Sequence, residues 1–300
     1  MTHRLNLFLL ALILAVGLPY YWFLLDNSGA TLPAKPVSIA QLRALAGSVP
    51  GEAPYAVEME RSAFRRIPGN LMVAGSGMKR KLIGYIGFRL PVRGGKPVLI
   101  EGGITPQVAA AAKAEQFNFS AQARIEQAID QAGLILVTHE HPDHLGAIAA
   151  HGGAALRDAA WLNPAQLAAK LPWNGPKPPS RLSGTAVQAV APGIVVIPAP
   201  GSHTPGSQLI YVRLSDGREF LFVGDNSSFA QNWRDQRGRS RLVETWYAPE
   251  NRAEVFAWLR TIRALKAQAP AMVIVPGHDW EWLENPENRA GIRIGFSRTP

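Results

Sequence analysis

One short segment of this 300-residue chain gathers side chains that bind metal ions. It reads HEHPDH and supplies four ligand-type residues in an H-x-H-x-D-H pattern, namely His139, His141, Asp143 and His144. Neutral imidazole and carboxylate groups are the ligand types that zinc, iron and manganese all accept. A turn that follows a strand can aim alternate side chains at two adjacent ions. The segment therefore predicts a metal centre.

Three further residues of the same types stand in the same kind of position. His203, Asp225 and His278 each follow a short apolar run, at residues 194–197, 220–223 and 272–275, just as His139 follows residues 134–137. A lone histidine is more often an ordinary hydrogen-bonded residue, and we assign His3 and His151 to that class. The remaining five histidines fall after predicted strands, which is typical of a shared site.

The combined pattern resembles the metallo-β-lactamase-fold hydrolases over residues 82–280. The matching segments are THEHPDHLG at 138–146, GSHTPGS at 201–207, GD at 224–225 and PGHD at 276–279. The resemblance implies an α/β fold, a four-layer αββα sandwich with the site along one edge. It also implies that one metal is held by His139, His141 and His203, a second by Asp143, His144 and His278, and that Asp225 bridges them.

The ligand set is similar to that of glyoxalase II, lactonases and phosphodiesterases. It implies a dinuclear hydrolase that directs a metal-bridging hydroxide at an ester, lactone, thioester or phosphodiester bond of a small molecule. The two divalent ions are expected to be zinc, with iron or manganese as alternatives. Asp143 is the candidate catalytic residue, because it can also shuttle a proton.

Two departures narrow the substrate. The chain has no cysteine, which excludes thiol catalysis, disulfides, iron–sulfur clusters and the cysteine-ligated β-lactamases. Other enzymes of that class lack a bridging aspartate at the position of Asp225, so antibiotic hydrolysis is not expected. Where the family often has Asp-x-Gly, this chain has Glu101-Gly102-Gly103, and the role of Glu101 is left open.

Two other functions remain as alternatives on the same fold. One is a mononuclear iron dioxygenase of the persulfide dioxygenase type, and the other is a non-catalytic metal-binding protein. The full set of second-metal residues favours the hydrolase. No RNA-binding module is recognisable, so a nucleic-acid partner is not expected, and the oligomeric state is left open.

The N-terminus predicts a membrane segment. Residues 5–25 form a run of 21 without a charge, roughly 30 Å as a helix, which matches a bilayer core. Arg4 before it and Asp26 after it favour a cytoplasmic N-terminus, with the catalytic domain on the periplasmic side. The expected organisation is a signal anchor at 1–25, a linker at 26–54 with a short helix at 38–46, and a catalytic domain at 55–300. The alternative is a signal peptide cleaved near Ser28-Gly29-Ala30, which would make the protein secreted.

Charge and aromatic residues leave two questions open. The net charge of +9 lies outside the N-terminal segment, and four arginines crowd residues 234–241. These arginines either recruit an anionic group or form a solvated or membrane-surface loop. Five aromatic residues either wall an apolar pocket or belong to the core: Trp173, Phe229, Trp233, Trp246 and Tyr247.

The elements that must position the cluster can be read from the pattern of apolar residues. Residues 82–90 and 97–100 are expected to form a hairpin, as are residues 209–214 and 220–223. Residues 105–132 predict a helix that starts at Thr105 and breaks near Asn118. Residues 255–267 have the apolar spacing of a helix face.

Overall fold

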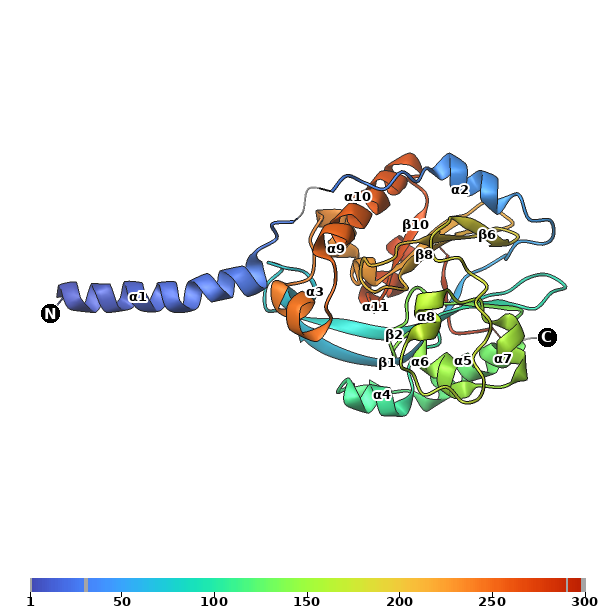
Figure 1. The fold of residues 1–300 in the computed structure, drawn as a ribbon, viewed down its shortest axis with the longest axis horizontal. Coiled ribbons are helices and arrows are strands. Elements are labelled where there is room, and N and C mark those ends of the chain that lie inside the picture. The colour runs from blue at the N-terminus through green and yellow to red at the C-terminus, as the bar shows by residue number, and fades with distance from the viewer. Residues whose placement is uncertain (1, 30–31, 290, 298–300) are drawn as a thin grey trace.

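The computed structural model describes residues 2–29, 32–289 and 291–297, and Figure 1 shows two sheets enclosed by helices, with one long helix projecting from the domain. The first sheet has the strand order β11-β1-β2-β3-β5, and β4 pairs with β1 at one point. Its strands are β1 (Glu58–Pro68), β2 (Arg80–Leu90), β3 (Val98–Ile100), β4 (Gln116–Phe117), β5 (Leu134–Leu136) and β11 (Arg293–Ile294).

The second sheet has the order β10-β9-β8-β7-β6. Neighbours in it are antiparallel except β9 and β10, which run parallel. As a result β7, β9 and β10 all point the same way and end at one edge. The strands are β6 (Gln188–Ala191), β7 (Ile194–Pro198), β8 (Gln208–Arg213), β9 (Glu219–Gly224) and β10 (Val273–Pro276).

Alternation along the strands builds the layers. In β9, Phe220 and Phe222 lie in the core between the two sheets, whereas Leu221 and Val223 face the helices outside. Successive side chains of a strand point to opposite faces, so one strand contributes to both cores. Across the central layer the rings of Phe88 and Phe222 meet edge-on at 5.1 Å.

Helices cover the outer face of each sheet, which confirms the predicted four-layer αββα sandwich. The second sheet is covered by α2 (Ile39–Ala46) and α10 (Arg252–Gln268), and the first by α5 (Phe119–Gln131), α6 (Gly146–His151) and α7 (Ala154–Ala159). Shorter helices fill the connections. They are α3 (Gly69–Met72), α4 (Pro106–Ala111), α8 (Pro164–Ala168), α9 (Ala230–Asp235), α11 (Trp280–Glu284), α12 (Pro286–Arg289), η2 (Asp225–Ser227) and η3 (Val243–Tyr247).

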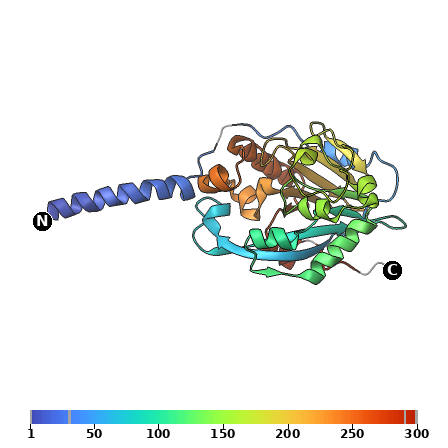
Figure 2. The same ribbon diagram turned by 60° about the horizontal axis from the view of Figure 1, so that its bottom comes forward.

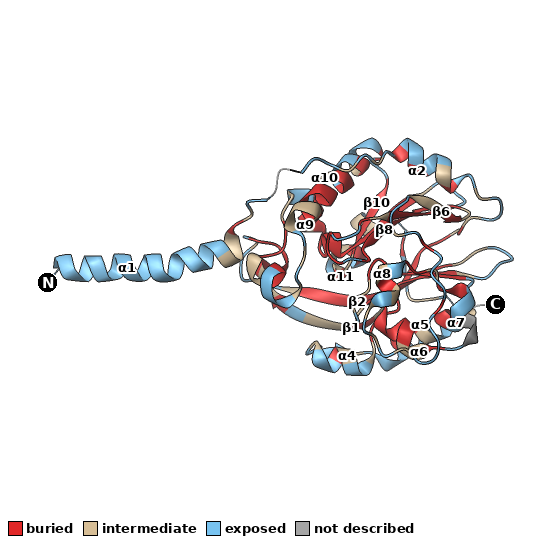
Figure 3. Ribbon diagram, in the orientation of Figure 1, coloured by how far each residue is buried: buried red, intermediate tan, exposed pale blue. Residues whose placement is uncertain are grey.

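The N-terminal apolar run is helical and stands apart from the domain. It forms α1 (Thr2–Tyr20) followed by one π-helical turn, η1 (Tyr21–Leu25). None of the residues of α1 is buried. Figure 2 shows the helix projecting from the domain, and Figure 3 shows it coloured as exposed. Residues 2–25 are long and apolar enough to cross a membrane, which is also true of a signal sequence.

The segment expected to be a linker lies against the domain for much of its length. Its predicted short helix is present as α2, where Leu42 is fully buried against the second sheet. Arg43 donates two hydrogen bonds to Glu219 of β9, at 2.8 and 2.7 Å. Burial of an apolar helix face explains why this stretch does not stand free.

The helical prediction for residues 105–132 holds at its start and at its break. Thr105 caps α4, β4 lies in the interruption, and Asn118 caps α5 by accepting a bond from the Ala121 amide at 3.0 Å. One strand differs from the sequence prediction. Strand β1 was not predicted, because charged residues interrupt its apolar pattern. Those charges are paired: Glu58 accepts from Arg89 at 2.6 Å, and Glu60 accepts from Arg124 at 2.6 Å.

Candidate metal centre

The sandwich brings all seven predicted ligand residues to one edge. His139 follows β5 of the first sheet, while His203, Asp225 and His278 follow β7, β9 and β10 of the second. Because these strands end at the same edge, residues far apart in sequence meet there. Two groups of ligand atoms result, each within 4.8 Å: His139, His141, His203 and Asp225 in one, and Asp143, His144 and His278 in the other.

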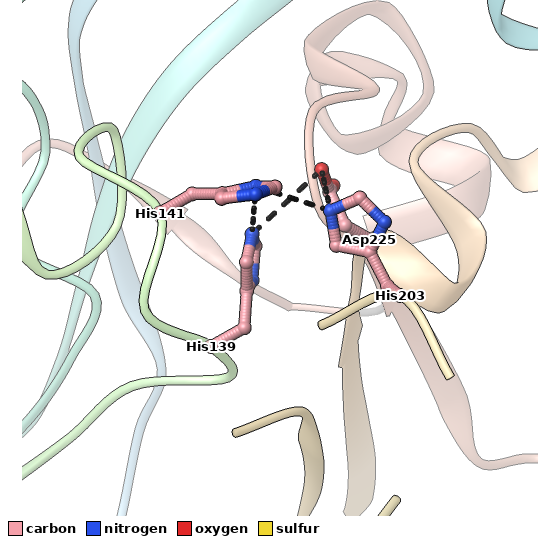
Figure 4. Close-up of side chains that lie close together, drawn as sticks. All are labelled: His139, His141, His203 and Asp225. Carbon is pink, nitrogen blue, oxygen red and sulfur yellow. Dashed lines mark hydrogen bonds and ion pairs between the residues drawn. The ribbon is translucent and has the colours of Figure 1, made fainter. Parts of the chain in front are cut away.

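The first group converges on one point, as Figure 4 shows. His141 Nδ1 lies 3.1 Å from His139 Nε2 and 3.1 Å from His203 Nε2. The Oδ2 atom of Asp225 lies 3.5 Å from His203 Nε2 and 3.9 Å from His139 Nε2. Three imidazoles and one carboxylate thus present their donor atoms to a common centre.

The second group converges beside the first and shares Asp225 with it. His144 Nε2 and His278 Nε2 are 3.3 Å apart, and Asp143 Oδ2 lies 3.7 Å from His278 Nε2. The other carboxylate oxygen of Asp225, Oδ1, is 3.3 Å from His278 Nε2. Asp225 therefore turns one oxygen toward each group.

These separations fit bound cations. A tetrahedral zinc ion with ligand bonds of about 2.0–2.1 Å holds neighbouring donor atoms about 3.4 Å apart. The imidazole nitrogens of both groups lie close to that spacing, at 3.1 and 3.3 Å. Neutral nitrogens with facing lone pairs repel one another unless a cation or a proton lies between them. The chain thus presents a metal-binding His/Asp cluster, which we call the metal cluster.

The ring nitrogens that face away from the cluster have partners that fix the ring orientation. His278 Nδ1 lies 2.9 Å from the Gly84 carbonyl oxygen, and His203 Nδ1 lies 2.8 Å from Glu250 Oε2. His144 Nδ1 lies 3.1 Å from Glu101 Oε2. A carbonyl or carboxylate in such a contact holds a metal-ligating histidine in the tautomer whose free nitrogen faces the ion. At His203 the Nη1 atom of Arg239 also lies 2.7 Å from Nδ1.

Glu101 therefore has a definite place. Its backbone adopts a positive φ of 64°, which is uncommon for a residue with a side chain. Its Oε1 atom accepts bonds from the Thr138 amide at 3.0 Å and the Thr138 hydroxyl at 2.6 Å, while Oε2 faces His144. One buried carboxylate thereby links the turn that carries His139 to the ring of His144.

Arg239 was assigned to an exposed or anion-recruiting arginine segment, but its side chain lies inside the site. It is 5% exposed and donates to Asp225 Oδ2 at 2.6 Å and to Glu250 Oε2 at 2.9 Å. The two carboxylates neutralise a guanidinium that burial would otherwise disfavour. Glu250, whose side chain is 1% exposed, carries no sequence signal of its own.

The other arginines of that segment also have internal partners. Arg237 donates to the Ala74 carbonyl at 2.7 Å, and Arg241 donates to Asp26 at 2.7 Å. The Arg234 guanidinium lies 5.0 Å from the ring of Trp282. Most arginines of this segment therefore contact other parts of the domain and hold this part of the chain in place.

Close backbone approach requires glycine at two points in the site. Gly224 has a positive φ of 54° and lies against the side chain of Thr138. A Cβ atom on Gly277 would collide with Oδ1 of Asp225. The two glycines before Asp225 and His278 therefore let the two ligand-bearing loops touch.

Glu140, the middle residue of the HEH triplet, joins two loops. Its Oε2 atom accepts from the Thr204 hydroxyl at 2.7 Å, and its Oε1 atom accepts from the Gly206 amide at 3.0 Å. This contact ties the loop of His203 to the loop of His139 and His141.

Burial and neighbouring charges keep the histidines of the first group neutral, which is the form that binds a metal ion. Burial, with the neighbouring imidazoles, lowers the pKa of His139 well below its ordinary value, and burial with Arg239 does the same for His203. Both rings are therefore neutral and can donate a lone pair. Burial also opposes the charge on His144, but the carboxylates of Glu101 and Asp143 outweigh it and raise the pKa of His144 to about 9.

A cavity of about 610 Å³ opens above the metal cluster. His141, Asp143, His203, Asp225 and His278 line its floor. Its walls are largely apolar, from Ile67, Met72, Ile83, Tyr85 and Val108, and four residues form what we call the rim: Leu71, Leu242, Val243 and Tyr247. A small molecule with an apolar part can therefore reach the cluster.

Of the five aromatic residues considered for a pocket wall, Tyr247 lines this cavity. Phe229 and Trp233 are buried in the core, and Trp246 is exposed. Trp173 packs against the core beside α5 and α6. His151 pairs with Asp130 on the surface at 2.8 Å, and His3 is an exposed residue of α1, so neither belongs to the cluster.

Comparison with known proteins agrees with this architecture. The family model described as the metallo-beta-lactamase superfamily matches residues 90–278. A curated relative, the hydroxyacylglutathione hydrolase of Albidiferax ferrireducens, is 36% identical over 144 residues, which are 46% of this chain and 48% of the relative. The chain thus matches about half the length of that protein.

Solved structures with the same fold include lactonases. A quorum-quenching N-acyl homoserine lactone lactonase superposes with a TM-score of 0.59 at 16% identity, covering 76% of this chain and 94% of that one. A mutant of B. thuringiensis AiiA superposes with a TM-score of 0.59 at 15% identity, covering 77% and 96%. At such identities the likeness concerns the fold.

Proposed function

Because the chain belongs to the metallo-beta-lactamase superfamily and carries its metal-dependent hydrolase site, we propose that it is a dinuclear hydrolase of an ester, lactone, thioester or phosphodiester bond. The observation that carries the proposal is the carboxylate of Asp225, which turns Oδ2 to the first group of ligand atoms and Oδ1 to the second. A carboxylate with one oxygen directed at each group of ligand atoms suits a site for two ions better than a site for one.

The proposed ligand assignment follows from these contacts. His139, His141 and His203 hold one divalent ion, Asp143, His144 and His278 hold the other, and Asp225 bridges them. The ions we expect are zinc, because imidazole and carboxylate suit it, and iron and manganese accept the same donors. When bound, such a pair supplies an acidified water and polarises the scissile group.

The protein's own residues perform the remaining tasks. Asp143 is the proposed proton carrier, because its side chain is 26% exposed and lines the cavity, unlike the more deeply buried ligands. Other carboxylates keep the imidazoles in place: Glu250 at His203 and Glu101 at His144. The apolar walls hold the rest of the substrate and keep bulk water from the cluster. Hydrolysis then consumes one water. An ester or thioester releases an acid with an alcohol or a thiol, a lactone opens to one hydroxy acid, and a phosphodiester releases a phosphomonoester and an alcohol.

The test combines metal analysis with a substrate screen. Purified full-length protein loaded with zinc should hold close to two ions per chain and hydrolyse at least one of the ester, lactone, thioester or phosphodiester substrates. One ion per chain together with oxygen consumption on a persulfide would instead establish the dioxygenase. Metal binding without turnover of any substrate would establish a non-catalytic protein.

We also propose that residues 1–25 anchor the domain, numbered 55–300, in the membrane with the domain on the periplasmic side. The support lies just after the helix, where Asp26 is 6% exposed and accepts a bond from Arg241 at 2.7 Å. Ser28 is held as well, because Arg252 donates to its carbonyl at 2.9 Å. Cleavage near residues 28–30 would remove these partners from the domain.

Topology and processing can be measured together. A C-terminal reporter that works only outside the cytoplasm should be active, and the N-terminal peptide should be found in the membrane-bound protein by mass spectrometry. A reporter active only in the cytoplasm would reverse the orientation. A mature chain that begins near residue 31 would replace the anchor by a signal peptide.

A further inference from the structure

The mouth of the cavity lies at the foot of the N-terminal helix. Helix α3 connects the two: the Asn70 side chain donates to the Tyr20 hydroxyl at 3.5 Å, and the next residue, Leu71, lines the cavity. The turn η3 connects them a second time, because the ring of Trp246 lies 4.9 Å from that of Phe23 and the next residue, Tyr247, lines the cavity. Figure 1 shows α3 at the end of the domain from which α1 projects.

The mouth of the cavity lies beside the end of the apolar helix that would sit at the membrane interface. Tyr20, Tyr21 and Trp22 stand at the end of the apolar helix, where aromatic rings prefer the headgroup region of a bilayer. Trp246 touches this level through Phe23. If the helix spans the membrane, as proposed above, the rim therefore lies at the lipid surface.

The surface around the mouth has the character of a membrane contact. Trp246 is 58% exposed and Tyr247 is 77% exposed, although both are large aromatic residues. Met78, at 56%, lies at the same end of the domain, because its sulfur is 3.6 Å from the Asn70 amide that reaches Tyr20. Lys79 follows it and is exposed, as is Arg80, which pairs with Glu115 at 2.9 Å. Apolar side chains flanked by cations suit an anionic lipid surface.

We propose that the substrate is a membrane amphiphile, a molecule whose acyl chain enters from the lipid surface across the rim and whose ester, lactone or thioester group reaches the metal cluster. The apolar walls take the chain, and the floor of histidines and aspartates takes the polar group. This inference rests on the proposed hydrolase and on the proposed anchor.

The activity test uses the full chain, zinc-loaded, in vesicles of phosphatidylcholine with a minor share of phosphatidylglycerol. Thioesters of one thiol with acetyl or dodecanoyl chains are compared. We expect kcat/KM to favour the dodecanoyl thioester by at least about 100-fold, because each buried methylene adds to binding. Leu71→Gln should lower that ratio by about fivefold or more. Phe119→Gln, which alters an exposed apolar residue outside the cavity, should leave it unchanged.

A binding test that needs no metal separates the two proposals. A photoreactive dodecanol in the same vesicles is crosslinked to metal-stripped protein, and the labelled peptides are mapped. We expect labels at residues 69–72 and 242–247, reduced by Leu71→Gln. Labels confined to residues 2–25, with equal turnover of both thioesters, would overturn the amphiphile while leaving the hydrolase intact. Labels at the rim without turnover of any substrate would overturn the hydrolase while leaving the binding of an amphiphile intact.

A third measurement identifies whether the acyl chain of the substrate enters from the lipid surface or from solution. The dodecanoyl thioester is supplied below its micelle concentration, with and without vesicles. A large rise in rate with vesicles supports entry from the lipid surface. Equal rates would overturn that route, because the chain would then enter from solution.

Discussion

The floor and the rim of the cavity are built in opposite ways. The floor takes its polar groups from the segments that follow β5, β7, β9 and β10. Three of the floor residues are held by buried partners outside the cluster: His203 by Glu250, Asp225 by Arg239 and His278 by the Gly84 carbonyl. The rim comes from α3, Leu242 and η3, where Tyr247 is 77% exposed and Val243 is buried. Strand ends position the metal cluster, whereas short connecting segments supply the residues that would select the substrate. Variants in the two regions should therefore fail in different ways.

The largest effect is expected in the floor. Asp225→Ala removes the carboxylate that faces both groups of ligand atoms, and we expect metal content to fall sharply. Activity should fall by at least about 10³-fold, because metal ions contribute several kcal/mol of transition-state stabilisation. Elemental analysis and kcat/KM check both points. Retention of two ions per chain would remove Asp225 from its bridging role.

Metal removal should destabilise the floor and with it the whole domain. Ligand at about 1,000 times its dissociation constant stabilises a protein by about 4 kcal/mol, which for a domain of this size corresponds to a rise in Tm of about 8–16 °C. Calorimetry of zinc-loaded and chelator-treated protein measures the difference. Equal melting temperatures would mean that the seven residues do not bind metal.

A smaller loss of metal affinity or activity is expected for residues that hold the metal ligands without being ligands themselves. Arg239→Met deletes the guanidinium between Asp225 and Glu250 and leaves both carboxylates without it. Contacts that orient metal ligands are worth about 10- to 100-fold in metal affinity or activity, and we expect a loss in that range. Glu250→Gln and the double variant complete a cycle. Strictly additive losses would show that the two residues act independently.

The smallest effect is expected at the rim. Leu242→Ala removes part of an apolar rim side chain and should change KM by less than about tenfold. Metal content and melting temperature should match those of the unaltered protein, because no ligand is touched. A loss of metal in this variant would erase the contrast between floor and rim.

The same contrast explains what could be predicted from the sequence. The strands that precede the ligands were predicted within about one residue, since unbroken apolar runs such as residues 194–197 and 220–223 mark buried strands and polar residues after them mark a sheet edge. The metal cluster followed, because His139, His141, Asp143 and His144 are neighbours in sequence. Their convergence with His203, Asp225 and His278 agrees with the resemblance to the family.

The residues that support the cluster could not be found in this way. Glu250 and Arg239 act through contacts across the fold, and an arginine inside a basic segment has no local signal of burial. Strand β1 was missed for a related reason: Glu58 and Glu60 lie on buried positions whose partners, Arg89 and Arg124, come from β2 and α5. Charge pairing over long sequence distance is invisible until the fold is known.

The route of the chain from helix to sheet has a mechanical consequence. Between η1 and β1, the chain is tethered first by Asp26 to Arg241, then by Lys35 to Thr261 of α10, and then by α2 to β9. Once the contacts of Tyr20, Phe23 and Leu24 with the domain have broken, tension applied at the membrane end would load these tethers in that order, before any strand. The first of them lies two residues from Arg239, so lateral force in the bilayer reaches the metal cluster by a short path. In a pulling experiment, Arg241→Ala should weaken the first of these three ruptures and leave the other two.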